Sequence, residues 1–332
     1  MRPNISNIWP TDLYKDFGPQ FDVGNVHSRD TAIYVNISDK CPLNCHFCRD
    51  QIDDTYLSRN CSIMTTQIFQ HAIEACVEHG VWYYSLMCLF GEPFMDRSIF
   101  DKIDILESNS GVRSYNIPSN FIPATRRTID SLLDVKKGLL KISIYGADEQ
   151  EYDAFTKTSG NFPKLLNNLQ YLYEQLKSTK SELKVTIMMK HRVFDSNYPR
   201  GELYYMLRKL SLLPNVRIDS FEVYTSNRAI TDEQMMAPNG GTIKKGICSS
   251  GTVGIIYPNG DVGYCYYCDV YRKHVMGNIL SQSLADIYNN TNGPYHNLLK
   301  NMNKDIYNDV CSRCDFFSPI AEDHKSKLNL DE

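Results

Sequence analysis

The feature that most constrains the fold is an alternation of strand-like and helix-like segments that begins near residue 31. The first helical pattern opens at Thr65 or Thr66 and closes at Gly80, as a capped helix does. Strands separated by helices predict right-handed crossovers and a parallel sheet. We expect strands at 31–37, 81–89, 112–118, 139–145, 183–189 and 216–224, and helices at 65–79, 98–109, 125–136, 161–177 and 197–211.

A cysteine-rich loop follows the first of these strands. Cys41, Cys45 and Cys48 fall within one short stretch, separated by three residues and then by two. Thiolates are preferred ligands of iron–sulfur clusters, zinc and copper(I). Three thiolates fill three corners of a cubane cluster and leave one iron open to a ligand that is not protein. The alternative is half of a structural zinc site, which His46 inside the loop could complete.

A second group of cysteines lies near the C-terminus, around a predicted hairpin turn at 258–261. The hairpin is expected to join strands at 253–257 and 262–264, and a helix is expected to start near Ser283. A structural zinc ion is an alternative occupant for this group too. The cysteines of this group are Cys248, Cys265, Cys268, Cys311 and Cys314.

Composition narrows the class of protein. The chain has 11 cysteines, clustered in metal-like spacings, and no apolar run long enough for a signal peptide or a membrane span. That pattern favours metal or cluster binding in a reducing compartment over a disulfide framework, so we expect a cytoplasmic protein. A net charge of −4 and a pI near 6.1 predict neither a nucleic-acid nor a membrane partner.

The cysteine loop resembles the hallmark of the radical SAM enzymes, Cys-x-x-x-Cys-x-aromatic-Cys, with Phe47 at the aromatic position. Residues 90–93, Phe-Gly-Glu-Pro, resemble the family's Gly-Gly-Glu-Pro motif, with Phe90 in place of the first glycine. The resemblance implies a partial (β/α)6 TIM-like barrel. It also implies a 4Fe–4S cluster whose open iron binds S-adenosylmethionine (SAM), and reductive cleavage of SAM to a 5′-deoxyadenosyl radical.

The same resemblance implies further site residues at the ends of the predicted strands. Gly91, Glu92 and Pro93 correspond to the motif that holds the SAM amino group. Asn120 and Ser143 match positions that border SAM in relatives, and with Phe47 they complete the predicted cofactor contacts. Candidates for catalytic groups, chosen by position alone, are Tyr145, Lys190, His191 and Arg228.

The C-terminal cysteines resemble the SPASM/Twitch module, a small α+β domain that carries auxiliary 4Fe–4S clusters. Modules with two such clusters need seven or more cysteines, so the five here imply one cluster. Its expected ligands are Cys248, Cys265, Cys311 and Cys314, with Cys268 as a possible alternative. The implied division is a lead-in at 1–30, the barrel at 31–228, a linker at 229–247, the auxiliary module at 248–318 and a tail at 319–332.

The resemblance implies a radical SAM oxidoreductase with two 4Fe–4S clusters and SAM as cofactors, reduced by a flavodoxin or a ferredoxin. With one auxiliary cluster to accept an electron, we expect a dehydrogenase-type reaction on a sugar-like or aminocyclitol-like small molecule. One alternative is a maturase that crosslinks or epimerises a ribosomally made peptide. Another is a metal-stabilised binding module without catalysis.

Overall fold

The computed structural model describes residues 32–45, 48, 62–189, 201–220, 244–267, 269, 271–314, 317–320 and 328. None of the helices in these ranges has the length and the apolar character needed to cross a lipid bilayer.

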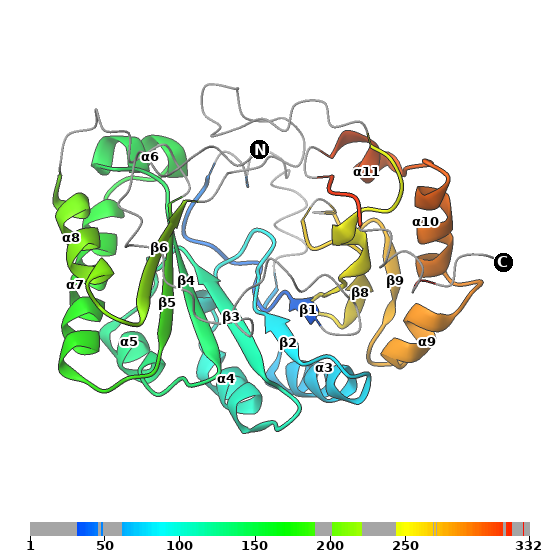
Figure 1. The fold of residues 1–332 in the computed structure, drawn as a ribbon, viewed down its shortest axis with the longest axis horizontal. Coiled ribbons are helices and arrows are strands. Elements are labelled where there is room, and N and C mark those ends of the chain that lie inside the picture. The colour runs from blue at the N-terminus through cyan, green and yellow to red at the C-terminus, as the bar shows by residue number, and fades with distance from the viewer. Residues whose placement is uncertain are drawn as a thin grey trace.

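Six parallel strands form the first part of a single sheet (Figure 1). They lie in chain order, which confirms the α/β class and the expected run of crossovers. The predicted run 216–224 begins as a strand, and its residues after 220 lie outside the described ones. The strands are β1 (Ala32–Val35), β2 (Tyr83–Ser85), β3 (Ser114–Ser119), β4 (Gly138–Ile144), β5 (Lys184–Met189) and β6 (Val216–Ser220).

Helices follow these strands and cover one face of the sheet (Figure 1). Local side chains fix several starts: Thr65 accepts a hydrogen bond from the N–H of Ile68, and Thr125 from that of Thr128. Helix α6 was not predicted, because only Tyr152, Phe155 and Thr156 are buried in its eight residues and its apolar pattern is short. The helices are α3 (Thr66–Glu78), α4 (Ile99–Ser108), α5 (Arg126–Leu132), α6 (Glu149–Thr156), α7 (Phe162–Ser178) and α8 (Glu202–Ser211), with a short 3-10 helix η5 (Pro93–Met95).

The two faces of the parallel sheet differ in chemistry. Residues such as Ile33 and Ile142 point to the helices and belong to the main apolar core. The strand register places polar side chains together on the other face, where Ser85 Oγ donates to Asn116 Oδ1 over 2.8 Å. We call this surface the polar face; it consists of Ser85, Asn116, Lys141, Ser143, Thr186 and Arg217.

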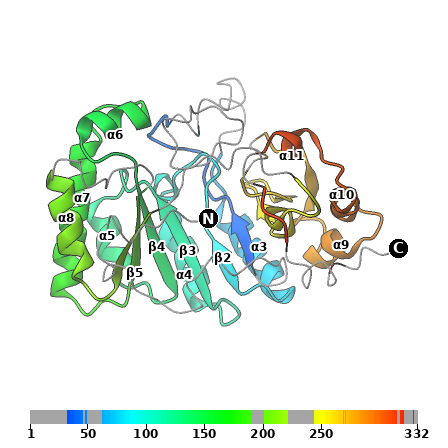
Figure 2. The same cartoon turned by 45° about the horizontal axis from the view of Figure 1, so that its top comes forward.

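The C-terminal part of the chain extends the same sheet. β7 (Ile255–Ile256) pairs in parallel with β1, and β8 (Asp261–Gly263) and β9 (Val275–Asn278) continue antiparallel from it. The predicted hairpin is therefore present, whereas its attachment to the first barrel strand was not foreseen. The helices of this region are α9 (Leu284–Asn289), α10 (Pro294–Asn303) and α11 (Asp309–Arg313), which lie together on one side of the molecule in Figure 2. A short 3-10 helix, η7 (Ser249–Thr252), precedes β7.

Candidate functional site

The cysteine loop lies at the carboxyl edge of the parallel sheet, directly after β1. Its backbone is held by one hydrogen bond to the end of α6 and by one within the loop. The N–H of Asn44 donates to the carbonyl of Thr156 over 3.0 Å, and the N–H of Cys48 donates to the carbonyl of Cys45 over 3.0 Å. Cys45 is buried, while Cys41 and Cys48 are partly exposed. Phe47, predicted between them as a cofactor contact, lies outside the described residues.

The ends of β2 and β3 reach the thiols of this loop. Asn120 Nδ2 lies 3.4 Å from Cys41 Sγ, with the geometry of a hydrogen bond from the amide to the sulfur. The Cys48 thiol lies 3.9 Å from the carbonyl oxygen of Leu89. The structure therefore brings Asn120, predicted from its position after the third strand, into contact with the first cysteine set.

Glu92 joins the loops that follow β2 and β3. Its carboxylate accepts hydrogen bonds from Ser119 Oγ at 2.7 Å, the N–H of Asn120 at 2.7 Å and the N–H of Phe94 at 3.2 Å. Burial raises the pKa of Glu92 from 4.5 to about 7, although these three donors act in the opposite direction. The Glu92 carboxylate thus positions Asn120, and its oxygens can also accept a hydrogen bond from a bound amine.

Gly91 is required by a close approach of the chain. A Cβ built at Gly91 would lie 1.9 Å from the carbonyl oxygen of Ser38, which belongs to the segment that leads into Cys41. Pro93 is buried at the first position of η5. The residues predicted as a SAM-binding motif therefore also pack the β2 end against the cysteine loop.

Ser143 and Tyr145 lie at the end of β4, near the same thiols. The Tyr145 ring stacks on Phe155 with centroids 5.5 Å apart. The pKa of Tyr145 is raised well above its ordinary value, first by burial and then by the Cys45 thiol, while a hydrogen bond from Ser143 acts against the shift. A phenol with a raised pKa stays protonated, so Tyr145 can donate a hydrogen bond but is a poor general base at neutral pH.

Three of the predicted catalytic candidates are not placed by the structure. Lys190, His191 and Arg228 lie outside the described residues, as does Cys268. Their roles stay predictions.

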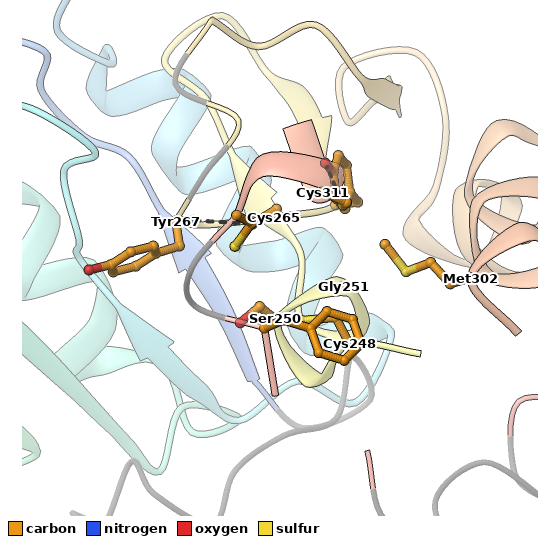
Figure 3. A pocket seen from close by; sticks show the side chains of 10 residues that line it. Cys248, Ser250, Gly251, Cys265, Tyr267, Met302 and Cys311 are labelled. Carbon is orange, nitrogen blue, oxygen red and sulfur yellow. Dashed lines mark hydrogen bonds between the residues drawn. The ribbon is translucent and has the colours of Figure 1, made fainter. Parts of the chain in front are cut away.

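The second cysteine set lines one pocket in the C-terminal module (Figure 3). Cys248 comes from the start of η7, Cys265 from the segment after β8, and Cys311 and Cys314 from α11 and its end. Met302 of α10 extends toward the thiols (Figure 3). The structure therefore brings together all four residues predicted as ligands of the auxiliary cluster.

The donor set of this pocket fits an iron–sulfur cluster. Burial raises the pKa of Cys311 to about 12 and also raises that of Cys248. These thiols therefore need a positively charged centre beside them to lose their protons and act as thiolate ligands. Cys265 Sγ accepts a hydrogen bond from the N–H of Tyr267 over 3.4 Å. In the described ranges, no three His, Cys, Asp or Glu side chains converge as ligands for a single metal ion, and the four thiols surround the pocket instead.

Residues that lie near the two cysteine sets in the chain contact each other directly, which sequence reasoning missed. Tyr34 of β1 stacks on Tyr266, the residue after Cys265, with ring centroids 3.7 Å apart. Arg272 donates to the buried Asp39, two residues before Cys41, over 2.6 Å. Both contacts join residues more than 200 positions apart, so no local pattern signals them.

Comparisons with known proteins agree with this geometry. Residues 248–315 match the SPASM family, described as an iron-sulfur cluster-binding domain. BtrN, solved in complex with AdoMet and 2-DOIA, has a TM-score of 0.55 at 15% identity over 88% of this chain and 95% of BtrN. The anSMEcpe structure with bound AdoMet and the Cp18Cys peptide has a TM-score of 0.56 at 14% identity over 86% of each chain. A search of curated protein sequences found no match.

These findings confirm the resemblance to radical SAM proteins with a SPASM-type module at the level of fold, and the iron–sulfur assignment of the C-terminal region.

Proposed function

We propose that this protein is a radical SAM enzyme that cleaves SAM reductively, abstracts a hydrogen atom from a polar small molecule and oxidises that molecule by two electrons. The observation that carries the proposal is the placement of two thiol sets on one sheet. The first lies at the carboxyl edge, in contact with Asn120. The second lines a four-thiol pocket, and its Cys265 is followed by Tyr266, which stacks on Tyr34 of β1.

Cys41, Cys45 and Cys48 would hold the first cluster, which with SAM supplies hydrogen-atom abstraction when bound. The chain's own residues orient the reactants around it. Asn120 donates to Cys41, and Glu92 fixes the backbone of Asn120. Ser143 and Tyr145 present hydroxyl groups from β4 on the same side of the site.

A dehydrogenation requires the removal of an electron and a proton after the first hydrogen atom has been abstracted. When an alcohol becomes a ketone, the carbon loses a hydrogen atom, and the remaining electron and the hydroxyl proton must then leave. The four-thiol pocket is suited to hold a cluster that would accept that electron, because Cys265, one of its thiols, is followed directly by Tyr266, and the Tyr266 ring stacks on Tyr34 of β1. The proton acceptor is sought in Lys190 and His191, since the raised pKa of Tyr145 makes it unsuitable and the guanidinium of Arg228 keeps its proton and can only donate.

The polar face supports a hydroxyl-rich or charged small molecule as substrate. Asn116, Thr186 and Ser143 are buried on this face, so a ligand seated against them exchanges water for fixed donors and acceptors. Arg217 Nε donates to Thr186 Oγ1 over 3.0 Å and adds a positive charge beside that row. A sugar-like or aminocyclitol-like alcohol matches this chemistry.

Anaerobic reconstitution tests the proposal. We expect about eight irons per chain in the wild type and about four in a variant with Cys41, Cys45 and Cys48 all changed to Ala. After reduction by flavodoxin, ferredoxin or dithionite, only the wild type should form 5′-deoxyadenosine. The matched control is Cys76→Ala, a buried cysteine of α3 outside both sets, which should keep all its iron.

The product assay separates the alternatives. Turnover of sugars or aminocyclitols to ketones supports the dehydrogenase reaction. Crosslinking or epimerisation of a peptide, with no alcohol oxidised, would replace it with a peptide maturase. Zinc in place of iron, and no cleavage of SAM, would refute radical chemistry and leave a metal-stabilised binding module.

A further inference from the structure

The four-thiol pocket contains a side-chain hydrogen bond to one of its own cysteines. Tyr264, the residue before Cys265, is almost completely buried at 1% exposure. Its hydroxyl lies 3.3 Å from Cys311 Sγ, on a segment 47 residues away in the chain. Both residues line the pocket, so the contact lies where a cluster would be bound.

The direction of this hydrogen bond follows from Asn308, the residue that caps α11. Asn308 Oδ1 accepts the N–H of Cys311 over 2.7 Å, which fixes the orientation of the amide. Its Nδ2 then faces the Tyr264 hydroxyl oxygen over 3.2 Å, and an amide nitrogen only donates. The Tyr264 oxygen is therefore an acceptor from Asn308, which leaves its own hydrogen to point at the Cys311 sulfur.

The phenol is held rigidly in this position. The ring of His274 packs edge-on against that of Tyr264 with centroids 5.8 Å apart. His274 Nε2 in turn lies 3.0 Å from Asp309 Oδ1, and Asp309 is the first residue of α11. Asn308 and Asp309, which hold Tyr264 directly and through His274, lie at the start of α11, the helix that also carries Cys311. The Tyr264 side chain is therefore fixed relative to the Cys311 sulfur.

Cys311 differs from two other thiols of the set in the kind of donor it meets. Cys265 accepts a hydrogen bond from the backbone N–H of Tyr267, and Cys248 accepts backbone hydrogen bonds from Ser318 and Ser250, which act against the rise in its pKa that burial causes. Backbone donors are present whatever the sequence. The Tyr264 hydroxyl is a donor that one substitution removes.

We propose that Tyr264 is a positioning residue that tunes the auxiliary cluster, and that its hydroxyl hydrogen bond to Cys311 raises the reduction potential of that cluster. A hydrogen bond to a ligating sulfur withdraws negative charge from it and so stabilises the reduced state more than the oxidised state. A higher potential favours transfer of an electron from the substrate to this cluster. The inference rests on the proposed function, because it takes the four thiols as cluster ligands.

The experiment compares Tyr264→Phe with its parent in a background where Cys41, Cys45 and Cys48 are all Ala, so that only the auxiliary cluster contributes. Iron and sulfide are counted, and the potential is measured by redox titration followed by EPR. The matched control is Tyr267→Phe, which alters a phenol of the same pocket but keeps the backbone N–H that serves Cys265.

We expect Tyr264→Phe to retain about four irons and to have a lower potential. The ratio of reduced to oxidised cluster at a fixed applied potential should fall about fivefold, the size expected for one net hydrogen bond. Tyr267→Phe should titrate as the parent does. Full iron loading with an unchanged potential in Tyr264→Phe would overturn the inference and leave the proposed function intact, whereas a parent without iron would overturn the proposed function itself.

A second measurement covers the case in which Tyr264→Phe loads less iron than its parent. Pulsed EPR of the reduced parent should show a hydrogen coupled to the cluster that is missing from the clusters that do assemble in Tyr264→Phe, since only the hydroxyl hydrogen is removed by the substitution. The absence of that coupling would equally overturn the inference.

Discussion

Replacing Arg272 by methionine would break the buried ion pair that connects the C-terminal module to the cysteine loop. Arg272 Nη2 lies 2.6 Å from Asp39 Oδ1, and the side-chain exposures are 13% and 0%. The guanidinium also lies over the ring of Tyr257, 4.7 Å from its centroid. Methionine keeps the apolar stem of the arginine, so the change isolates the charge and its hydrogen bond.

The expected cost is about 3 kcal/mol of unfolding free energy. Removal of one partner from a buried pair costs about 3–5 kcal/mol, because the other charge stays buried without its counter-ion. The lower end applies here, since Asp39 keeps the amide of Asn36 at 2.7 Å and the N–H and hydroxyl of Ser62 at 3.3 Å as donors.

Urea unfolding of the reconstituted protein measures this cost. Lys273→Met is the matched control: the neighbouring cation pairs with Asp309 at 2.9 Å, but the two side chains are 47% and 49% exposed. An exposed pair contributes at most about 1 kcal/mol. We also expect Arg272→Met to slow the formation of 5′-deoxyadenosine, because Asp39 precedes Cys41 by two residues. Equal unfolding midpoints for the two variants would refute the reasoning.

Two further predictions concern the end of β2. Because the folded pKa of Glu92 is about 7, above the ordinary 4.5, the folded state holds the proton more tightly. The unfolding free energy should therefore fall by up to about 3 kcal/mol as pH rises from about 4.5 to 7, and then level off. Urea midpoints measured across this pH range should show this fall in the wild type. The same fall in Glu92→Gln would contradict its assignment to the Glu92 carboxyl. Gly91→Ala should abolish iron binding by the first cysteine set, since its Cβ would lie 1.9 Å from a backbone oxygen of Ser38. Gly201→Ala, whose Cβ meets no atom within 4 Å, should load normally, and equal loading of the two variants would refute the steric argument.

Much of the fold was predictable because its signals are local. Strand runs, helix caps such as Thr65, and the turn at 258–261 each depend on neighbours within a few residues, and the structure contains them. Helix α6 was missed because its eight residues carry too short an apolar pattern to separate it from a loop.

The candidate site was predictable in part for the same reason. Cysteine spacing pointed to both thiol sets, and the resemblance of the strand-end residues to radical SAM motifs pointed to Asn120 and Glu92. The sequence did not show that the Glu92 carboxylate accepts three hydrogen bonds from the chain. These bonds result from the way the ends of β2 and β3 pack together. Nor did the sequence show that burial keeps Tyr145 protonated.

By itself, the sequence determined the ligand chemistry and the alternation of strands and helices, since both depend on residue type and short spacing. Only the tertiary structure decided that β7 pairs with β1, so that the two thiol sets share one sheet and meet through Tyr34 and Tyr266. It also brought Tyr264 to Cys311. These contacts join residues that are distant in the chain, and their proximity results from the packing of the whole molecule rather than from any local pattern.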